Sequence, residues 1–255
     1  MTFWGAALIV LICAVAAGLG AMLIDRLLSM ESRRNHHEVG SAVFQQVGVM
    51  FSVLLAFVFS GAWQEHNVAA QSVNGECGAL HGAAILANAM PNHTGRPVNV
   101  AIVAYWRLVI DTEWPMLARG ERSPQATQAF RIALDTAARL PVRERADVAM
   151  RNQILTLIAQ AHADRETRTF EAGRGLPAPL WWVLIAVAGL LVTFIVLAGV
   201  DTPGHVLLSA AFAASTVGVL VTVRMLEFPF QGSLAVSSDD FAKLLGEVTM
   251  MLAGA

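Results

Sequence analysis

Residues 43–63, VFQQVGVMFSVLLAFVFSGAW, decide the fold of this chain, because they are long and apolar enough to cross a bilayer. No helix-breaking signal follows between Trp63 and Leu86, so the sequence predicts one helix that starts inside a membrane and leaves it uninterrupted. At the helical period, one narrow stripe of this helix is mostly small or polar. The stripe consists of Gln45, Gly48, Ser52, Ala56, Phe59, Trp63, Asn67, Ala70, Asn74 and His81. Bulky apolar residues lie on the opposite side, among them Met50, Phe51, Phe57 and Val58.

Two interpretations of this stripe stay open. The small residues Gly48, Ser52 and Ala56 recur at the spacing that brings two helix backbones close together, which favours helix packing. Alternatively, the stripe lines an aqueous pore, in which Phe59 and Trp63 form a hydrophobic constriction. One such helix cannot enclose a pore, so this second interpretation requires a ring of subunits. The pore-lining candidates are Gln45, Gly48, Ser52, Ala56, Phe59 and Trp63.

The composition of the whole chain is that of a membrane protein. Of its 255 residues 56% are hydrophobic and only 14% are charged, which is too apolar for an ordinary soluble domain. The net charge of −2 gives no reason to expect a nucleic acid partner. Four segments are long enough to span a bilayer, namely residues 3–24, 43–63, 180–200 and 205–225. We therefore expect the lipid bilayer itself to be the main partner.

A polar region at 64–179 separates the second and third spans, and its sequence predicts helices throughout. We expect Trp114-Pro115 to end one helix and Ser123-Pro124 to begin the next. Asp164 and Arg168 are predicted to form a solvated pair on the polar side of a later helix. The predicted fold class is all-α, with four transmembrane helices and a helical soluble insert. The predicted division is a first transmembrane hairpin at 1–63, the insert at 64–179, a second hairpin at 180–226 and a C-terminal tail at 227–255.

Signs of enzymatic chemistry are weak in this sequence. Cys13 and Cys77 lie in different regions, and no histidine or cysteine spacing typical of a metal site occurs. No span carries a charge at its centre, as a proton or ion relay would. We therefore expect no catalytic site, no metal and no cofactor.

The tail after the fourth span contains a turn and an acidic pair. Pro229-Phe230 and Gly232 form the predicted turn, and Asp239 and Asp240 follow two serines. Serine at a helix cap and aspartate in the first turn are favourable, so this pattern predicts the start of a helix.

These short motifs resemble those of a known family. The tail turn followed by Asp239-Asp240-Phe241 is similar to the proline-phenylalanine-glycine and acidic run of the bestrophin anion channels. The second span agrees with its Leu54-Leu55-Ala56-Phe57, Trp63 and Glu76. Glu113-Trp114-Pro115-Met116, Leu176-Pro177 and Leu180-Trp181 resemble the bacterial bestrophin-like membrane proteins of unknown function. The resemblance covers nearly the whole chain in order and spacing.

The resemblance implies a homo-oligomer, pentameric in bestrophins, that is permeable to inorganic anions. Ser52, Ala56 and Phe59 would form its hydrophobic neck, and the tail turn with Asp239 and Asp240 would occupy the place of the calcium clasp. The acidic run is only two residues long here, so calcium gating is not expected.

Two features of the sequence predict opposite locations for the insert. The resemblance implies a bacterial inner membrane with the insert in the cytoplasm. The connection at 25–42 lies on the opposite side of the membrane from the insert. It carries Arg26, Arg33 and Arg34, which favour a cytoplasmic position for the connection instead. The alternative function is a non-conducting membrane scaffold whose helical insert binds a partner protein.

Overall fold

The computed structural model describes residues 1–27, 37–198 and 203–253, and within these ranges every regular element is a helix. The all-α fold class predicted from the sequence is confirmed. The elements in chain order are α1 (Phe3–Leu27), α3 (His37–Asn88), η1 (Pro91–His93), α4 (Arg96–Leu108), the π-helix η2 (Val109–Glu113), α5 (Trp114–Leu117), α6 (Pro124–Ala138), α7 (Arg145–Gly173), α8 (Ala178–Leu197), α9 (Pro203–Leu226), η3 (Gly232–Leu234) and α10 (Asp239–Ala253). The predicted connection through Arg33 and Arg34 lies outside the described residues.

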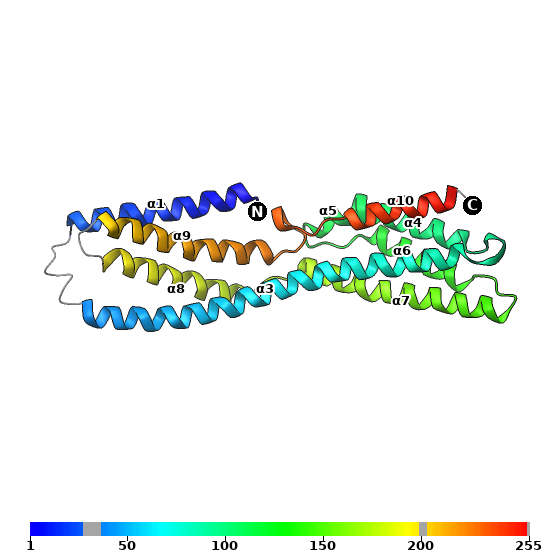
Figure 1. Ribbon diagram of the computed structural model, residues 1–255, viewed down its shortest axis with the longest axis horizontal. Helices are drawn as coiled ribbons and strands as arrows, with labels where there is room; N and C mark the ends of the chain where they lie inside the picture. Colours follow the sequence, from blue (N-terminus) through cyan, green and yellow to red (C-terminus); the bar gives the residue numbers. More distant parts are fainter. Residues whose placement is uncertain (28–36, 199–202, 254–255) are drawn as a thin grey trace. The chain divides into compact units, whose positions relative to one another are not determined.

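Helix α3 is one uninterrupted element of 52 residues (Figure 1). At about 1.5 Å per residue it is about 78 Å long, more than twice the thickness of a hydrocarbon core. Its continuity follows from the sequence, because no proline occurs between His37 and Asn88. The prediction of a helix that continues from a membrane span into a polar segment is therefore confirmed.

The chain divides into two compact units, and α3 contributes to both. The first unit comprises Met1–Gln64 and Gly175–Glu227. The second comprises Glu65–Arg174 and Phe228–Ala255, so the residues after α9 belong to the same unit as the polar region.

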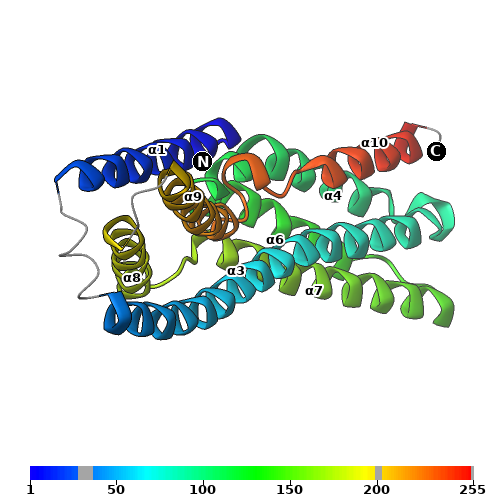
Figure 2. The ribbon, with the colours of Figure 1, turned by 60° about the vertical axis from the view of Figure 1, so that its left-hand side comes forward.

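The first unit is a bundle of apolar helices. By length and composition four helices could cross a membrane: α1, α3, α8 and α9. Helix α1 packs along α9, and α8 contacts both of them (Figure 2). Phe44 of α3 stacks on Phe194 of α8, with ring centroids 4.8 Å apart. Four apolar spans were predicted, and the described residues contain four such helices. Three predicted spans agree with α1, α8 and α9 to within a few residues, and the fourth, 43–63, lies within the longer α3.

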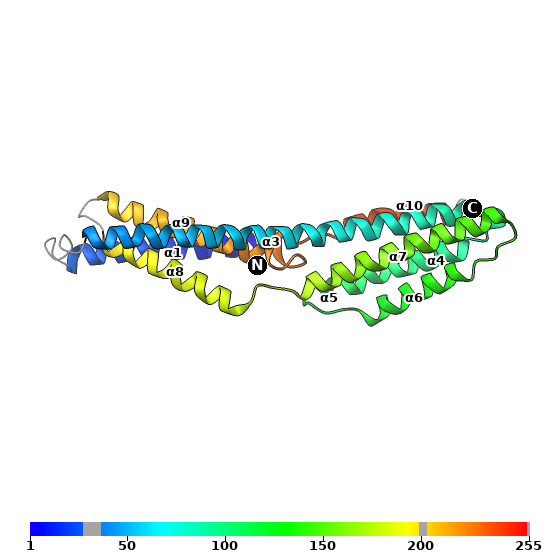
Figure 3. The same cartoon turned by 90° about the horizontal axis from the view of Figure 1, so that it is seen from below.

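The second unit is a helical bundle with a single hydrophobic core. Figure 3 shows α4, α6 and α7 beside the later part of α3. Trp106, Ile102 and Ile158 are fully buried in this core. Gly75 of α3 lies so close to α7 that an added Cβ would be 2.5 Å from an oxygen of Asp164. A larger residue at this position would require the Asp164 carboxylate to move.

One predicted helix boundary is wrong and another is confirmed. The helix that begins at Arg96 does not end at Trp114-Pro115 but continues to Leu117. It widens into a π-turn, in which the N–H of Trp114 donates to the carbonyl of Val109, and Pro115 then lies in the first turn of α5. Proline is tolerated there because the first turn of a helix needs no N–H donor. Ser123 caps α6 as predicted, since its Oγ accepts a hydrogen bond from the N–H of Ala126 at 3.2 Å.

Candidate functional site

The pore-lining candidates lie on a side of α3 that its own unit leaves uncovered, as it does the opposite side with Met50 and Phe57. Gln45, Ser52 and Ala56 are exposed, and so are Phe59 and Trp63, with exposed fractions of 37% and 51%. Gly48 is half-buried, yet an added Cβ would meet no atom within 4 Å. On another side of the same helix Phe51, Val58 and Ala62 are buried. The small and polar stripe is therefore not the surface by which α3 packs in its own unit.

The hydroxyl of Ser52 on this stripe needs no partner from another helix. The hydroxyl of Ser52 donates to the carbonyl of Val49, one turn earlier, at 2.8 Å. This bond satisfies the hydroxyl within α3, while its oxygen keeps the capacity to accept from water. Ser52 can therefore face either water or a second helix without leaving its hydroxyl proton unsatisfied.

The same stripe continues into the second unit, where α10 partly covers it. The Nε2 atom of His81 lies 3.4 Å from a carboxylate oxygen of Glu247 on α10. Asn67 and Ala70 are half-buried, whereas Asn74 is exposed.

The tail turn is a closed loop within the second unit. The N–H of Val236 donates to the carbonyl of Pro229 at 2.7 Å, and Gly232 adopts a φ of +79°. This left-handed conformation favours glycine, which explains why the turn contains one. Pro229 and Phe230 are buried, so the predicted motif points into the protein.

The acidic pair behaves as the start of a helix. Asp239 and Asp240 lie in the first turn of α10 and are both exposed. Ser237 Oγ donates to a carboxylate oxygen of Asp239 at 2.9 Å. The predicted helix start at this position is confirmed, and the two carboxylates suit the positive end of the helix dipole.

Trp114 joins the tail to the rest of the second unit. Its ring makes edge contacts with Phe230 and Phe241, each at 5.5 Å between centroids. Its Nε1 atom donates to the carbonyl of Val236 at 3.3 Å. The tail turn, the start of α10 and the Glu113-Trp114-Pro115 motif, which are far apart in sequence, thus form one aromatic cluster.

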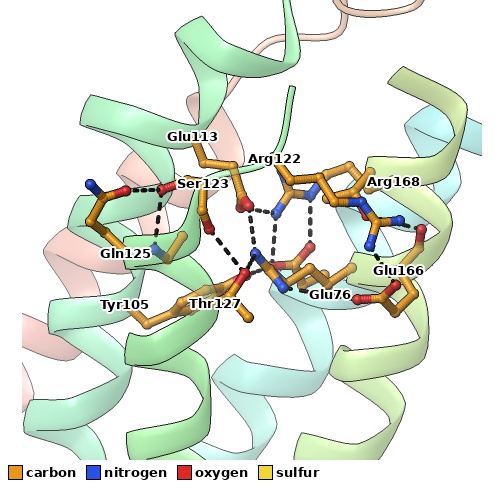
Figure 4. Close-up of polar contacts among 12 residues, drawn as sticks. Glu76, Tyr105, Glu113, Arg122, Ser123, Gln125, Thr127, Glu166 and Arg168 are labelled. Carbon is orange, nitrogen blue, oxygen red and sulfur yellow. Dashed lines mark hydrogen bonds and ion pairs between the residues drawn. The ribbon is translucent and has the colours of Figure 1, made fainter. Parts of the chain in front are cut away.

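A buried charge cluster, whose polar contacts Figure 4 shows, reaches these rings through Arg168. Arg168 of α7 donates through Nε to Glu76 at 2.8 Å and through Nη2 to Glu113 at 2.9 Å. Arg165 donates to the other oxygen of Glu113 at 2.5 Å, and the Tyr105 hydroxyl donates to Glu76. We call these five residues the charge cluster. Arg168, Glu76, Glu113 and Tyr105 are fully buried, and Arg165 is 2% exposed.

The electrostatics of the charge cluster hold its arginines charged. Burial lowers the pKa of Arg168, but the neighbouring charge of Glu76 and then those of Tyr105 and Glu113 outweigh burial and raise it. Burial, reinforced by Glu76, also raises the pKa of Tyr105 far above that of a solvated phenol, so its hydroxyl keeps its proton and donates. Two carboxylates therefore face two guanidinium groups and one hydroxyl, an arrangement whose formal charge is balanced.

Arg168 also contacts two aromatic faces. Its guanidinium carbon lies 5.2 Å from the centroid of Trp114 and 5.5 Å from that of Phe241. Both distances suit a cation–π interaction. Arg168 of α7 thus joins α3, η2, α5 and the start of α10 through one side chain.

The charge cluster overturns one prediction from the sequence. Asp164 and Arg168 do not form a solvated pair, because Arg168 is buried on Glu76 and Glu113. Asp164 instead lies against Gly75 of α3, and burial raises its pKa.

A signal for the charge cluster was nevertheless present in the sequence. The buried face of α7 runs through Ile154, Ile158, Ala161, Arg165 and Arg168, at steps of three and four residues. Extending the apolar stripe along the helix therefore leads directly to both arginines. A charge on a core-facing stripe requires a buried partner, and Glu76 and Glu113 are the carboxylates that supply it.

Comparisons with known proteins agree on one family. A family model described as a Bestrophin-like domain matches residues 11–241. Solved structures of a bacterial bestrophin homologue from Klebsiella pneumoniae are similar over nearly the whole chain. Two single-substitution variants each give a TM-score of 0.75. The first is 13% identical and covers 96% of this chain and 99% of its own, and the second is 14% identical and covers 96% and 98%. A third structure, phased with zinc, gives 0.73 at 14% identity and covers 95% and 98%. No curated protein matches the chain by sequence.

Proposed function

Because the chain belongs to the bestrophin-like family of membrane proteins, we propose that it assembles into a ring that conducts inorganic anions. In this ring the first half of α3 lines the pore. The observation that carries the proposal is the uncovered stripe of α3, whose candidates Gln45, Gly48, Ser52, Ala56, Phe59 and Trp63 are exposed or half-exposed. The family and the fold are channel-like, and the proposal assigns no catalytic step.

Burial within the first unit supports this orientation of α3. Phe51 and Val58 are 7% and 6% exposed, so the helix already packs by another face. A helix that satisfies its backbone internally can turn its remaining face to lipid, to a second subunit or to water. Small and polar residues suit water or close packing better than lipid. Five copies around an axis, as in bestrophins, would turn this face inward.

Phe59 is the proposed constriction of this pore. A large apolar ring that projects into a narrow pore disfavours water there and so limits conduction. Ala56 and Ser52, about one and two turns earlier, would continue the same narrow neck. The second unit is proposed to lie in the cytoplasm and the first in the inner membrane, with the tail turn and Asp239-Asp240 in the place of the calcium clasp of bestrophins.

Anion efflux from proteoliposomes tests the proposal. Phe59→Ala should raise chloride efflux several-fold over the wild type, because it removes the proposed constriction. Phe57→Ala is the matched control, since Phe57 is 75% exposed but lies on the opposite side of α3. Its efflux should equal that of the wild type. If wild type and Phe59→Ala both fail to release chloride, the chain is not an anion channel.

A scaffold is the second candidate, and a groove in the second unit favours it. The groove lies between α4 and α6, encloses about 600 Å³ and contains Val100 and Ile132, which are about half exposed. Exposed apolar residues in a groove can bind a partner protein. Val100→Asp would then abolish partner binding, while chloride efflux would be absent in both proteins.

A further inference from the structure

The first unit contains a large apolar cavity that the proposed pore does not use. It encloses about 1,010 Å³ and is lined by α1, α8 and α9. Most of its lining residues are apolar. The exceptions are Thr193, Thr216 and Arg224, together with the weakly polar Cys13 and Trp181. Along α1 the lining extends from Ile9 to Ile24, which corresponds to about 22 Å of helix. This length exceeds the roughly 15 Å of one bilayer leaflet.

One end of this cavity carries a charged and an aromatic side chain. Arg224 and Trp181 line one end, where α1 and α8 begin and α9 ends (Figure 1). Arg224 is an exposed residue whose Nη1 atom lies 3.3 Å from Glu227, and the indole nitrogen of Trp181 donates to the same Glu227 at 3.2 Å. The exposed indole rings of Trp4 and Trp182 also lie near the starts of α1 and α8. Tryptophans gathered with an arginine in this way mark the level of lipid headgroups.

We propose that this cavity binds a phospholipid, with an acyl chain along the apolar lining and the phosphate beside Arg224. In a bilayer, an open apolar cavity is surrounded by lipid acyl chains and not by water. An acyl chain can therefore enter the cavity without giving up any contact with water. The guanidinium supplies the charge that a phosphate requires, and it does so at the headgroup level rather than in the apolar part. The site would thus hold one lipid per subunit, with its headgroup at the level where α1 and α8 begin. It requires the first unit to lie in a membrane but does not require conduction.

The glycines of this unit offer a direct test. Gly189 lines the cavity, and an added Cβ there would meet no atom within 4 Å. Gly189→Leu would therefore project a side chain into the cavity without displacing the backbone. Gly218 of α9 is equally unobstructed but does not line the cavity, so Gly218→Leu is the matched control.

Native mass spectrometry of protein purified from membranes in a mild detergent would count bound phospholipids. We expect one phospholipid per subunit in the wild type and in Gly218→Leu, and its loss in Gly189→Leu with the oligomer mass unchanged. Equal lipid content in all three proteins would overturn the proposal. Dissociation of the oligomer in Gly189→Leu alone would also overturn it, because the occupant would then be a second copy of the chain.

A second measurement uses only the wild-type protein. A phospholipid with a photoreactive group in its acyl chain would be activated in proteoliposomes, and its adducts would be mapped by peptide mass spectrometry. Adducts should concentrate on Cys13, Ile185 and Val192 of the cavity. Adducts no more frequent there than on the outward-facing Leu11 and Leu190 would contradict the site.

Discussion

Arg168 is the residue on which the second unit depends most. It is fully buried, it bonds to both Glu76 and Glu113, and its guanidinium lies over the rings of Trp114 and Phe241. A guanidinium can do this because its donors form a planar fork and its face is weakly hydrated. A lysine ammonium could not bond to two carboxylates in this geometry and contact both rings at once.

Removing this guanidinium should destabilise the second unit strongly. Arg168→Met leaves Glu76 and Glu113 buried with too few partners, and the loss of one member of a buried ion pair typically costs about 3–5 kcal/mol. Thermal and denaturant unfolding of the purified protein would measure the change. Arg122→Met is the control, because Arg122 pairs with Glu166 at 2.9 Å with both side chains about half exposed. An exposed pair contributes only about 0–1 kcal/mol. Equal effects of the two substitutions would contradict this account of the charge cluster.

Asp164 should make stability depend on pH. Burial raises its pKa in the folded protein, so the ionised carboxylate destabilises the folded state at neutral pH. This penalty is complete above the folded-state pKa and disappears as the pH falls below the unfolded value of about 3.9. Asp164→Asn should therefore raise the melting temperature at pH 7, and the gain should shrink as the pH is lowered toward 4. The exposed Asp135→Asn should show no such gain, and a constant effect of Asp164→Asn at all pH values would refute the explanation.

At the scale of elements, α3 was predictable because one local property determines it. The long apolar run continues into polar sequence with no proline to interrupt a helix, and the structure has it as one helix. The cap of α6 was predictable for a similar reason, since Ser123-Pro124 specifies a helix start within a few residues. The stripe of α3 was also visible in the sequence, although its role in a pore stays a proposal.

The charge cluster was not predicted, because it depends on contacts between distant segments. Glu76 and Arg168 are 92 positions apart, and nothing local shows that they meet. The spacing of Asp164 and Arg168 satisfied a local rule for helix pairs, which tertiary packing overrode. The π-turn before Pro115 was missed for the opposite reason, since a local breaker signal was accommodated by one wider turn.

The stripe of α3 predicts an outcome for assembly. Gly48→Leu adds bulk where no atom lies within 4 Å, so the ring should still form with a mass of about 136 kDa for five copies of 27.2 kDa. Chloride efflux should fall, because the leucine would narrow the pore. Gly61→Leu adds the same bulk to an equally open position off the stripe and should leave efflux unchanged. Loss of the ring in Gly48→Leu alone would mean that the stripe packs helix against helix.

At the scale of the whole molecule, the chain returns to its second unit after the last apolar helix. Phe230 and Phe241, which follow α9, pack on Trp114 beside Arg168, so the tail completes the core built by the polar region. Among the motifs that resemble bestrophins, the tail turn, Asp239-Asp240-Phe241 and Glu113-Trp114-Pro115-Met116 therefore meet in one place and stabilise the second unit. Their shared role in this fold is packing, whereas the stripe of α3 carries the proposal of conduction.

The most direct test of conduction through α3 is chloride efflux from Ser52→Cys proteoliposomes before and after a charged, water-soluble thiol reagent. If Ser52 lines the pore, the reagent should abolish most of the efflux. Wild type, which has Cys13 and Cys77, should not respond to the reagent. Neither should Met50→Cys, since Met50 is 65% exposed but lies on the opposite side of α3. Efflux from Ser52→Cys that the reagent leaves unchanged, or that falls equally in Met50→Cys, would contradict the claim that this stripe lines an anion pore.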